Sequence, residues 1–368
     1  MADFTENDIL GFDPSQLSVF STSEQSQSSG NPLVYKTKPA ESVSEDGVYR
    51  ATIKIIYNPF DVKNSIIEQQ SYAIHDEQGW LTVVSSLTVN DRSCPIFTAW
   101  KKCHYADPGS MLWKQAALEK DGGKALFDKR FARYVTVQIL EDKNHPELEG
   151  QYLFWKLPTS IWTLINQKMA PSAESKKAAI PVMDFLFGRS IDIEVTPGPE
   201  DKLHPERKLR ETSYYGELSE DVVSCTNPDG SPLLNDEDQE VLDTYITQIK
   251  KVWKEKDPAV RSEMMQKINQ DPNTVKLRTI YRNTLEQIKQ FCPNIVEKMS
   301  YHEWPDSVKT RVQNWIDKVL AGKDPAQGAE NVPAVNLNTV TADTHKTEQT
   351  TTVAVETTPD GGIDDLPF

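Results

Sequence analysis

The sequence predicts an α+β protein that contains a small closed β-barrel, a helical domain after it and an acidic segment at each end. Between about residues 47 and 215, apolar and polar residues alternate in several short segments, which is the pattern of half-buried strands. Between about residues 236 and 321, apolar residues instead recur at the spacing of amphipathic helices. The two outer segments are acidic and contain few large apolar residues. The order along the chain is therefore tail, barrel, helices, tail.

The strand-rich region begins with GVYRATIKIIYNP at residues 47–59, where side chains alternate in polarity. Four further segments predict strands, namely residues 80–89, 132–142, 150–157 and 189–198. Short helices are predicted between them at residues 111–120 and 160–169. Several short strands joined by long charged loops favour a small closed barrel over a parallel sheet.

The helical region is predicted from apolar residues at helical spacing. In the first helix these residues are Val241, Tyr245, Ile249 and Val252. Asn235 or Asp236 would cap the start of this helix, because a short polar side chain can accept from its free N–H groups. A last helix is predicted around Trp315, with Pro305 near its start and Gly322 just past its end. We expect three or four helices in this domain.

These patterns divide the chain into four parts. Residues 1–35 form an N-terminal segment and Ser/Gln-rich linker, with five acidic residues and no Lys or Arg. Residues 36–215 form the core, and residues 216–321 form the helical domain. Residues 322–368 hold eight acidic and two basic residues, and their low content of large apolar side chains predicts a disordered tail.

Composition limits the class of protein. The chain has 368 residues and no apolar run of 18 or more, so no transmembrane helix and no membrane partner are expected. Its acidic start lacks the basic region of a signal peptide. The four cysteines are scattered, which favours a reducing compartment over a disulfide scaffold. We therefore expect a cytoplasmic protein.

The net charge of −15 conceals a basic stretch in the core. Residues 92–133 hold nine Lys or Arg against four Asp or Glu, with aromatic residues among them. Single-stranded nucleic acids are bound by this combination, since cations hold phosphates and aromatic faces stack on bases. The candidate DNA-binding residues are Trp100, Lys101, Lys102, Tyr105, Trp113, Lys114, Lys129, Arg130, Arg133, Tyr134, Trp155 and Lys156.

Two other interpretations of these residues were weighed against binding. Burial of an aromatic side chain stabilises a fold by about 1.5–3 kcal/mol, so we expect about half of the candidate rings to lie in the core. The neighbouring cations could equally be ordinary surface charge. No Walker loop, nucleophile elbow or zinc-protease motif occurs in the sequence, so no catalytic residues are predicted and no enzyme is expected.

Four short motifs follow one another in the core, within residues 47–200. They are Ser93, Cys94 and Pro95; Lys129 and Arg130 with Tyr134; Asp142 with Pro146, Glu147, Glu149 and Gly150; and Ile161 and Trp162 with Ile165 and Asn166. In this order they resemble the single-stranded DNA-binding proteins of T-even-like bacteriophages. The resemblance implies an OB-fold core whose cleft holds the strand, and a binding role for Lys129, Arg130 and Tyr134.

The chain departs from that family at its metal site and its N-terminal arm. The family holds a structural zinc through one His and three Cys. Cys94 is retained here, but Val84 and Phe97 stand at two other cysteine positions, and the adjacent pair Cys103 and His104 would be an unusual ligand set. No zinc or other cofactor is therefore expected. The family's arm is basic and drives cooperative binding, whereas this arm is acidic.

The C-terminal residues carry a separate signal. They are Asp364, Asp365, Leu366, Pro367 and Phe368. Two carboxylates, two apolar side chains and a proline-restricted backbone suit a basic-rimmed apolar pocket on a partner. This tip resembles that of bacterial single-stranded DNA-binding proteins, which end Asp-Asp-x-Pro-Phe, and the resemblance implies recruitment of replication and recombination proteins. An acidic tail also competes with phosphate for a basic cleft.

The core and the tip predict one function. We expect a bacteriophage single-stranded DNA-binding protein, in the cytoplasm of the infected bacterial host, that coats exposed strands during replication, recombination and repair. Three alternatives stay open: a single-strand annealing or recombination mediator, a metal-dependent nuclease, and an adaptor whose barrel is purely structural. The sequence does not predict the oligomeric state.

Overall fold

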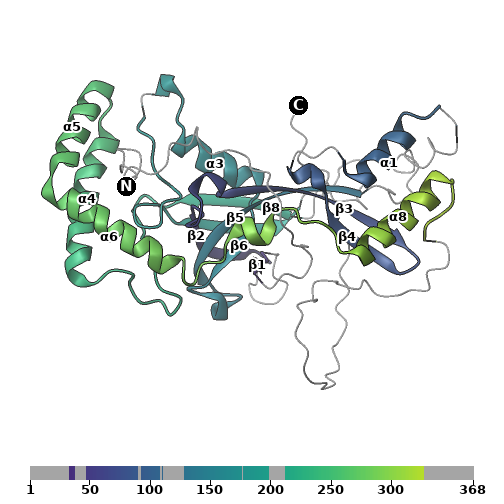
Figure 1. Ribbon diagram of the computed structural model, residues 1–368. Helices are drawn as coiled ribbons and strands as arrows, with labels where there is room; N and C mark the ends of the chain where they lie inside the picture. The colour runs from purple at the N-terminus through teal and green to yellow at the C-terminus, as the bar shows by residue number, and fades with distance from the viewer. Residues whose placement is uncertain are drawn as a thin grey trace, which may run out of the picture.

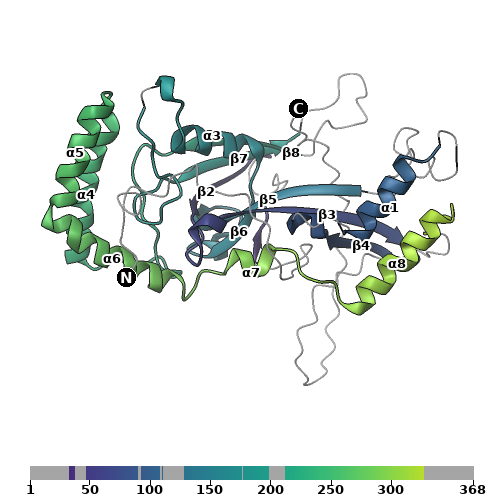
Figure 2. The same cartoon turned by 45° about the horizontal axis from the view of Figure 1, so that its top comes forward.

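The computed structural model is built around one sheet with helices at both ends (Figure 1). It describes residues 33–37, 47–89, 93–107, 110, 128–175, 177–198 and 212–326. Helices α4 (Asp236–Lys254), α5 (Pro258–Gln270) and α6 (Pro272–Ile288) lie at one end of the molecule. Helices α1 (Pro95–His104) and α8 (Asp306–Leu320) lie at the other end (Figures 1 and 2). The α+β class expected from the sequence is confirmed.

The sheet is mostly antiparallel and is open at its edges. Its strands are β1 (Val34–Tyr35), β2 (Tyr49–Ile56), β3 (Ile66–Asp76), β4 (Gly79–Val84), β5 (Asp128–Asp142), β6 (Tyr152–Lys156), β7 (Ile191–Pro197) and β8 (Thr212–Leu218). Six of them follow the order β1-β6-β5-β2-β7-β8, and β3 pairs with both β5 and β4. Only the β1–β6 pairing is parallel among the described strands. These pairings do not join β1 to β8, so they do not close the sheet into a barrel.

All five predicted strands are present, as β2, β4, β5, β6 and β7. Strands β1, β3 and β8 were not predicted. β3 reads IIEQQSYAIHD, and its polar residues Gln69 and Ser71 are buried along with its apolar ones. Because β3 is covered on both faces, its sequence lacks the alternation that would have revealed it.

The main core lies between the sheet and helix α3 (Thr159–Met169), which was predicted over residues 160–169. The helix turns Ile161, Ile165 and Met169 toward the sheet. Trp155 of β6 belongs to the same cluster and is 1% exposed. We call the strands β1, β2, β5, β6, β7 and β8, together with α3, the sheet core.

Part of the motif that resembles the phage family has a structural role in the turn after β5. Asp142 is fully buried and accepts from Tyr35 Oη at 2.7 Å and from the backbone N–H groups of Asn144 and His145. Glu149 Oε1 in turn accepts from the backbone N–H of Asp142 at 3.0 Å. Gly150 has a φ of 81°, and a Cβ there would lie 2.3 Å from a backbone oxygen. The turn therefore requires glycine at this position.

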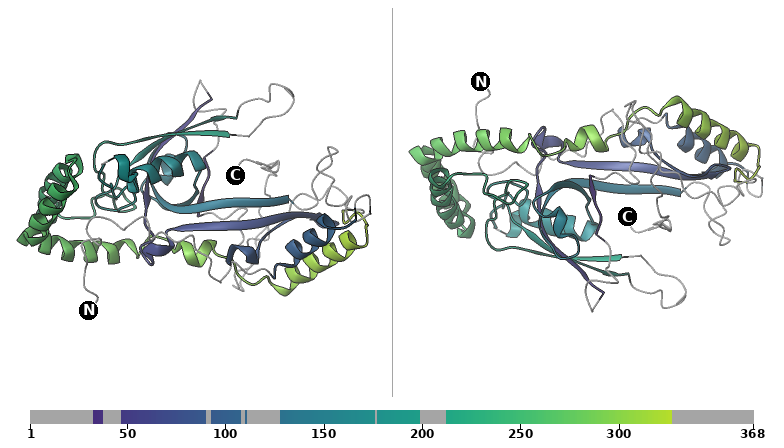
Figure 3. Two further views of the ribbon diagram at one scale, coloured as in Figure 1. Left: turned by 90° about the horizontal axis from the view of Figure 1, so that it is seen from above. Right: turned by 90° about the horizontal axis from the view of Figure 1, so that it is seen from below.

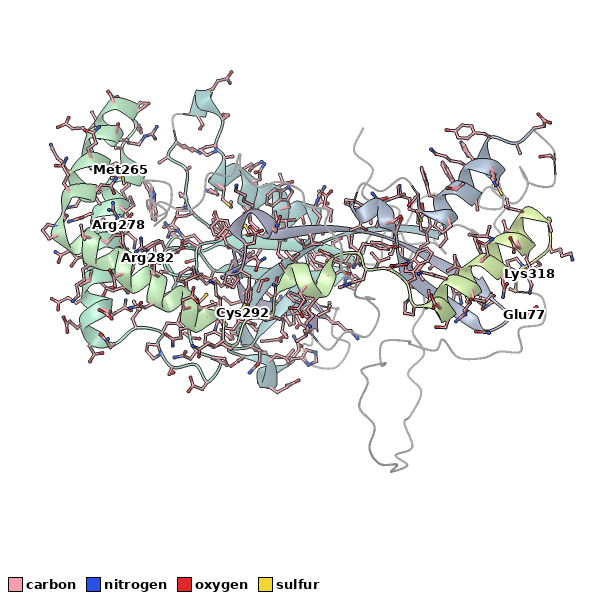
Figure 4. All side chains as sticks on the ribbon, viewed as in Figure 1. Glu77, Met265, Arg278, Arg282, Cys292 and Lys318 are labelled. Carbon is pink, nitrogen blue, oxygen red and sulfur yellow. The ribbon has the colours of Figure 1, made fainter. Side chains whose placement is uncertain are left out.

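Strands β3 and β5 extend beyond the sheet core as a long antiparallel pair, to which β4 adds a third strand (Figure 3). We call β3, β4 and residues 128–135 of β5 the ribbon. Helix α8 is fastened to the ribbon by an ion pair in which Arg311 donates to both oxygens of Asp76, each at 2.6 Å. Trp315 Nε1 also donates to the backbone oxygen of His75 at 3.0 Å. A second ion pair joins Lys318 in the last turn of α8 to Glu77, between β3 and β4 (Figure 4).

The helices of residues 236–320 contact three different parts of the molecule. α4, α5 and α6 pack on one another and on the segment that carries Phe185 and Phe187. The short helix α7 (Ile295–Met299) packs on the ribbon, where Gln69 Nε2 donates to the backbone oxygen of Met299. α8 packs on α1 and the β3–β4 hairpin. The sequence predicted these helices as one domain at residues 216–321, because spacing identifies the apolar side of a helix but not the surface it covers.

The predicted helix ends agree with the structure. Asn235 is the N-cap of α4, and its side chain accepts from the backbone N–H of Asp238 at 2.9 Å. Pro305 immediately precedes α8, and Gly322 follows it with a φ of 70°. No helix in the described part of the chain is both long and apolar enough to cross a membrane.

Candidate functional site

Helix α1 carries a column of stacked rings. Trp100 lies between Phe97, three residues before it, and His104, four residues after it, on one side of the helix. The Trp100 and Phe97 rings are 5.6 Å apart with planes 12° from parallel, and the Trp100 and His104 rings are 4.7 Å apart at 17°. Tyr105 meets His104 edge-on, at 4.9 Å and 84°. The column is therefore already formed in the protein.

Cations and an exposed tyrosine flank this column. Lys101 Nζ lies 4.6 Å from the centre of the Phe97 ring, which places the ammonium over an aromatic face. Lys101 and Lys102 are both exposed, and Tyr105 is 75% exposed. The end of the column at Tyr105 is thus open to solvent, and the Lys101 ammonium lies at the other end, over Phe97. We call Phe97, Trp100, His104 and Tyr105, with Lys101 and Lys102, the α1 column.

The buried side of α1 holds part of the column in place. Ile96, Ala99 and Cys103 are buried against Tyr72 of β3 and against α8. These three residues form the buried side of the helix. Phe97 and Trp100 are partly buried and pack against the same cluster, whereas His104 and Tyr105 are exposed. Cys94 precedes the helix and Pro95 is its first residue, which is the position that proline tolerates. The Ser-Cys-Pro motif therefore marks the start of α1.

The candidate DNA-binding residues of strand β5 lie on two different faces of the ribbon. Lys129 lies opposite Tyr72 in the β3–β5 register, so it shares the face that α1 covers. Alternation places Phe131 and Arg133 on this same face. Arg130 lies on the other face, with Tyr134, which packs against α7. Lys129 and Arg130 are adjacent in the sequence but are not on one surface.

Arg133 is engaged within the protein. Its Nε donates to Glu68 Oε1 at 2.7 Å, and both side chains are roughly three-quarters buried. Its guanidinium also lies 5.6 Å from the centre of the Phe131 ring. Glu68 therefore neutralises one of the cations that the sequence assigned to DNA. A phosphate could use Arg133 only by replacing or sharing this carboxylate.

The structure places two of the candidate aromatics in the core. Trp155 is 1% exposed, and its Nε1 donates to Thr37 Oγ1 at 3.2 Å. Tyr134 is 7% exposed, in a cluster with Phe154 and α7. Neither ring offers a face to a base in this structure. Lys156 is exposed at the end of β6, opposite Tyr134 in the β5–β6 register.

Several predicted residues fall outside the described part of the chain. They are Trp113, Lys114, Asp364, Asp365, Leu366, Pro367 and Phe368. The expected acidic segments at residues 1–35 and 322–368 also fall outside it, apart from residues 33–35 and 322–326. Sequence reasoning missed Phe97, His104, Phe131 and Glu68 as parts of the site. The spacing of Phe97, Trp100 and His104 was a signal that could have identified the column.

The four cysteines are free and buried. Cys94 and Cys103 are fully buried, while Val84 and Phe97 provide no ligand atom. No group of three or more His, Cys, Asp or Glu side chains gathers within the described ranges in a way that could hold a metal. Burial raises the pKa of the Cys225 thiol to about 11, which keeps it protonated at neutral pH.

A second group of buried ionisable residues lies where the sheet core meets α4 and α6. Lys54 is fully buried and donates to the backbone oxygen of Val223. Asp184 is also fully buried; its oxygens accept from Tyr281 Oη at 2.8 Å and from two backbone N–H groups. Burial lowers the pKa of Lys54 and raises the pKa of Asp184. Both side chains have no exposed surface, so this group joins the two parts of the molecule and is not accessible to a ligand.

Comparison with known proteins gives no family for this chain. No protein-family model matches it. No curated protein matches its sequence.

Proposed function

We propose that this protein binds single-stranded DNA, with the α1 column as the main stacking surface and Lys129 as a neighbouring phosphate contact. The observation that carries the proposal is the α1 column itself. Three rings are held in a stack, the exposed Tyr105 ring meets one end of it edge-on, and exposed lysines lie on the same helix. A base can stack on the exposed ring of Tyr105, while lysines of the same helix neutralise phosphates of the strand.

The arrangement favours single strands over duplex. In a duplex the base faces are already stacked on one another, so they cannot add to a protein column without unstacking. Stacking is also tolerant of sequence, because every base has an aromatic face. The rings are ordered before binding, so less side-chain entropy is lost when a base docks. The expected activity is therefore strand coating with little sequence preference.

The wider role that the sequence suggests is part of the same proposal. It comprises an OB-fold type of core, a bacteriophage setting, strand coating in replication, recombination and repair, and recruitment of partner proteins through Asp364 to Phe368. What supports it is the order of the four core motifs and the acidic tip of the sequence. Binding of single-stranded DNA by α1 is the part of this proposal that can be tested first.

The test is fluorescence anisotropy of full-length protein with labelled oligo-dT, a duplex control and a salt series. We expect preference for the single strand, and a fall in log affinity of about 0.7 per log unit of salt for each phosphate contact. Trp100→Ala should weaken binding, because it removes the middle ring on which His104 stacks beside Tyr105. Deletion of residues 360–368 should tighten binding at low salt, because a competing acidic segment is removed. Absence of binding at any salt concentration would refute the proposal.

A further inference from the structure

Strand β8 is hydrogen-bonded on one side only among the described residues. It pairs with β7 along its whole length, and no described strand pairs with its other side. The backbone N–H of Ser219 donates to the oxygen of Ser190 at 3.0 Å. This contact shows which residues of β8 are hydrogen-bonded to β7, because alternate residues direct their backbone groups to opposite sides. Residues 213, 215 and 217 point their backbone groups at β7, and residues 212, 214, 216 and 218 point theirs away.

The free side of β8 is close to the surface. Figure 3 shows β7 and β8 along one long side of the molecule, on the side opposite α8. Tyr215 is 58% exposed, and Glu217 is also exposed. Of the outward backbone oxygens, that of Tyr214 accepts from the exposed hydroxyl of Ser160 at 3.0 Å. A hydroxyl at the surface can return to water when a stronger backbone donor arrives.

The strand is complementary to itself. It has seven residues, TSYYGEL, with Tyr215 at the centre. Antiparallel pairing of two copies about Tyr215 sets residue 214 opposite residue 216 and residue 212 opposite residue 218. These are the residues whose backbone groups point outward, so both copies donate and accept in register. The hydrogen-bonding phase of the strand is therefore compatible with pairing about its central residue.

The side chains also agree with this alignment. Glu217 would lie opposite Ser213 of the second copy, so no like charges face each other across the axis. Tyr215 would meet its own counterpart, and aromatic pairs across strands are favourable. β8 itself also lacks the lysines and prolines with which proteins commonly block an exposed edge.

We propose that β8 is a self-association edge, through which two copies of this chain pair antiparallel about a two-fold axis at Tyr215 and form one continuous sheet. A two-fold axis makes the interface closed, so the product is a dimer and not a filament. The row of Arg50, Glu194 and Tyr215 in one copy would continue into the same row of the other. This inference does not depend on DNA binding.

Site-specific crosslinking tests the alignment. In the proposed dimer the two Cα atoms at position 215 are about 4.5 Å apart, because this is a non-hydrogen-bonded pair, and a disulfide spans roughly 4.4–6.8 Å. Full-length Tyr215→Cys should therefore form a covalent dimer under a mild oxidant. The native cysteines are buried and serve as the background. Glu217→Cys is the matched control, since its two copies would be about 13 Å apart. Equal crosslinking of both variants, or none by Tyr215→Cys, would overturn the proposal.

Charge complementation provides an independent test. Sedimentation velocity should show a dimer of the wild type within about 1 to 100 µM. Tyr215→Lys and Tyr215→Glu should each weaken the dimer roughly tenfold or more, because like charges would face each other. An equimolar mixture of the two should restore it. Val275→Lys, at a 55% exposed position on α6, controls for the loss of an exposed apolar side chain and should leave the dimer unchanged. A wild type that stays monomeric would contradict the proposal that β8 is a self-association edge. Tyr215 variants that dimerise as well as the wild type would contradict it too.

Discussion

Glu68 Oε1 accepts a hydrogen bond from Arg133 Nε at 2.7 Å on the face of the ribbon that also carries Lys129. The two side chains come from directly paired positions on β3 and β5, so the strand register itself brings them together. Both are about three-quarters buried. The pair thus removes one positive charge from a surface that would otherwise attract phosphate.

Removal of this carboxylate should strengthen strand binding. In Glu68→Gln, Arg133 loses its charged partner and becomes available to a phosphate. We expect tighter binding of oligo-dT at low salt and a salt dependence steeper by about 0.7 log units, the value of one added phosphate contact on a single strand. Anisotropy across a salt series measures both quantities.

The matched control for that change is Glu194→Gln, which breaks the exposed pair with Arg50 on β2 and β7. This substitution changes the net charge by the same amount as Glu68→Gln, but Glu194 lies away from α1. The salt dependence of oligo-dT binding by this variant should therefore equal that of the wild type. If both variants shift binding alike, the effect is one of overall charge and Arg133 is not part of the site.

Tyr105 should contribute to binding without contributing to the fold. The side chain is 75% exposed and meets only the edge of His104 among the described ring contacts. Tyr105→Ala should weaken oligo-dT binding by about 1–3 kcal/mol and leave urea unfolding unchanged. Phe60→Ala, at a 42% exposed position away from α1, is the control and should affect neither. Wild-type affinity in Tyr105→Ala would show that the open end of the column does not hold a base.

The ion pair between Arg311 of α8 and Asp76 of the ribbon should stabilise the fold more than an ordinary surface ion pair does. Arg311 and Asp76 are about nine-tenths buried, and Arg311 also donates to the backbone oxygen of Gly79 at 2.8 Å. Asp76→Asn leaves this guanidinium without its counter-charge, so the free energy of unfolding should fall by about 3 kcal/mol. Glu77→Gln removes the more exposed partner of Lys318 and should cost less than about 1 kcal/mol. Urea denaturation of the wild type and the two variants measures these free energies of unfolding. Equal losses in the two variants would mean that the burial of the Arg311–Asp76 pair does not add to stability.

The sequence was informative where a residue's role depends on its immediate neighbours. Alternation in β2 and the cap at Asn235 are local features, and both were predicted. The two faces of β5 illustrate the limit, because Lys129 and Arg130 have the same chemistry and only the register with β3 separates them. Trp100 and Trp155 likewise look alike in sequence. The first is partly buried between the rings of Phe97 and His104 on α1, and the second lies in the core between the sheet and α3.

Long-range packing accounts for the features that could not be predicted. The partner of Arg311 is 235 residues away in the sequence, and no local pattern encodes such a pair. The helices of residues 236–320 show the same limit, since an apolar stripe does not reveal which surface covers it. β3 was missed because a strand buried on both faces by α1, α7 and α8 loses its period of two.

His302 should make the protein less stable in mild acid. Partial burial lowers the pKa of this imidazole from 6.5 to about 4, and its Nε2 lies 3.1 Å from the backbone oxygen of Glu297 in α7. The folded state therefore resists protonation between pH 4 and 6.5, whereas the unfolded chain accepts the proton. Stability is fully present above about pH 6.5 and is lost as the pH falls toward 4. His302→Gln removes the titrating group, so the difference in unfolding free energy between pH 7 and pH 5 should be smaller than in the wild type. The same urea titrations at both pH values measure it, and an unchanged difference would mean that other groups control acid stability.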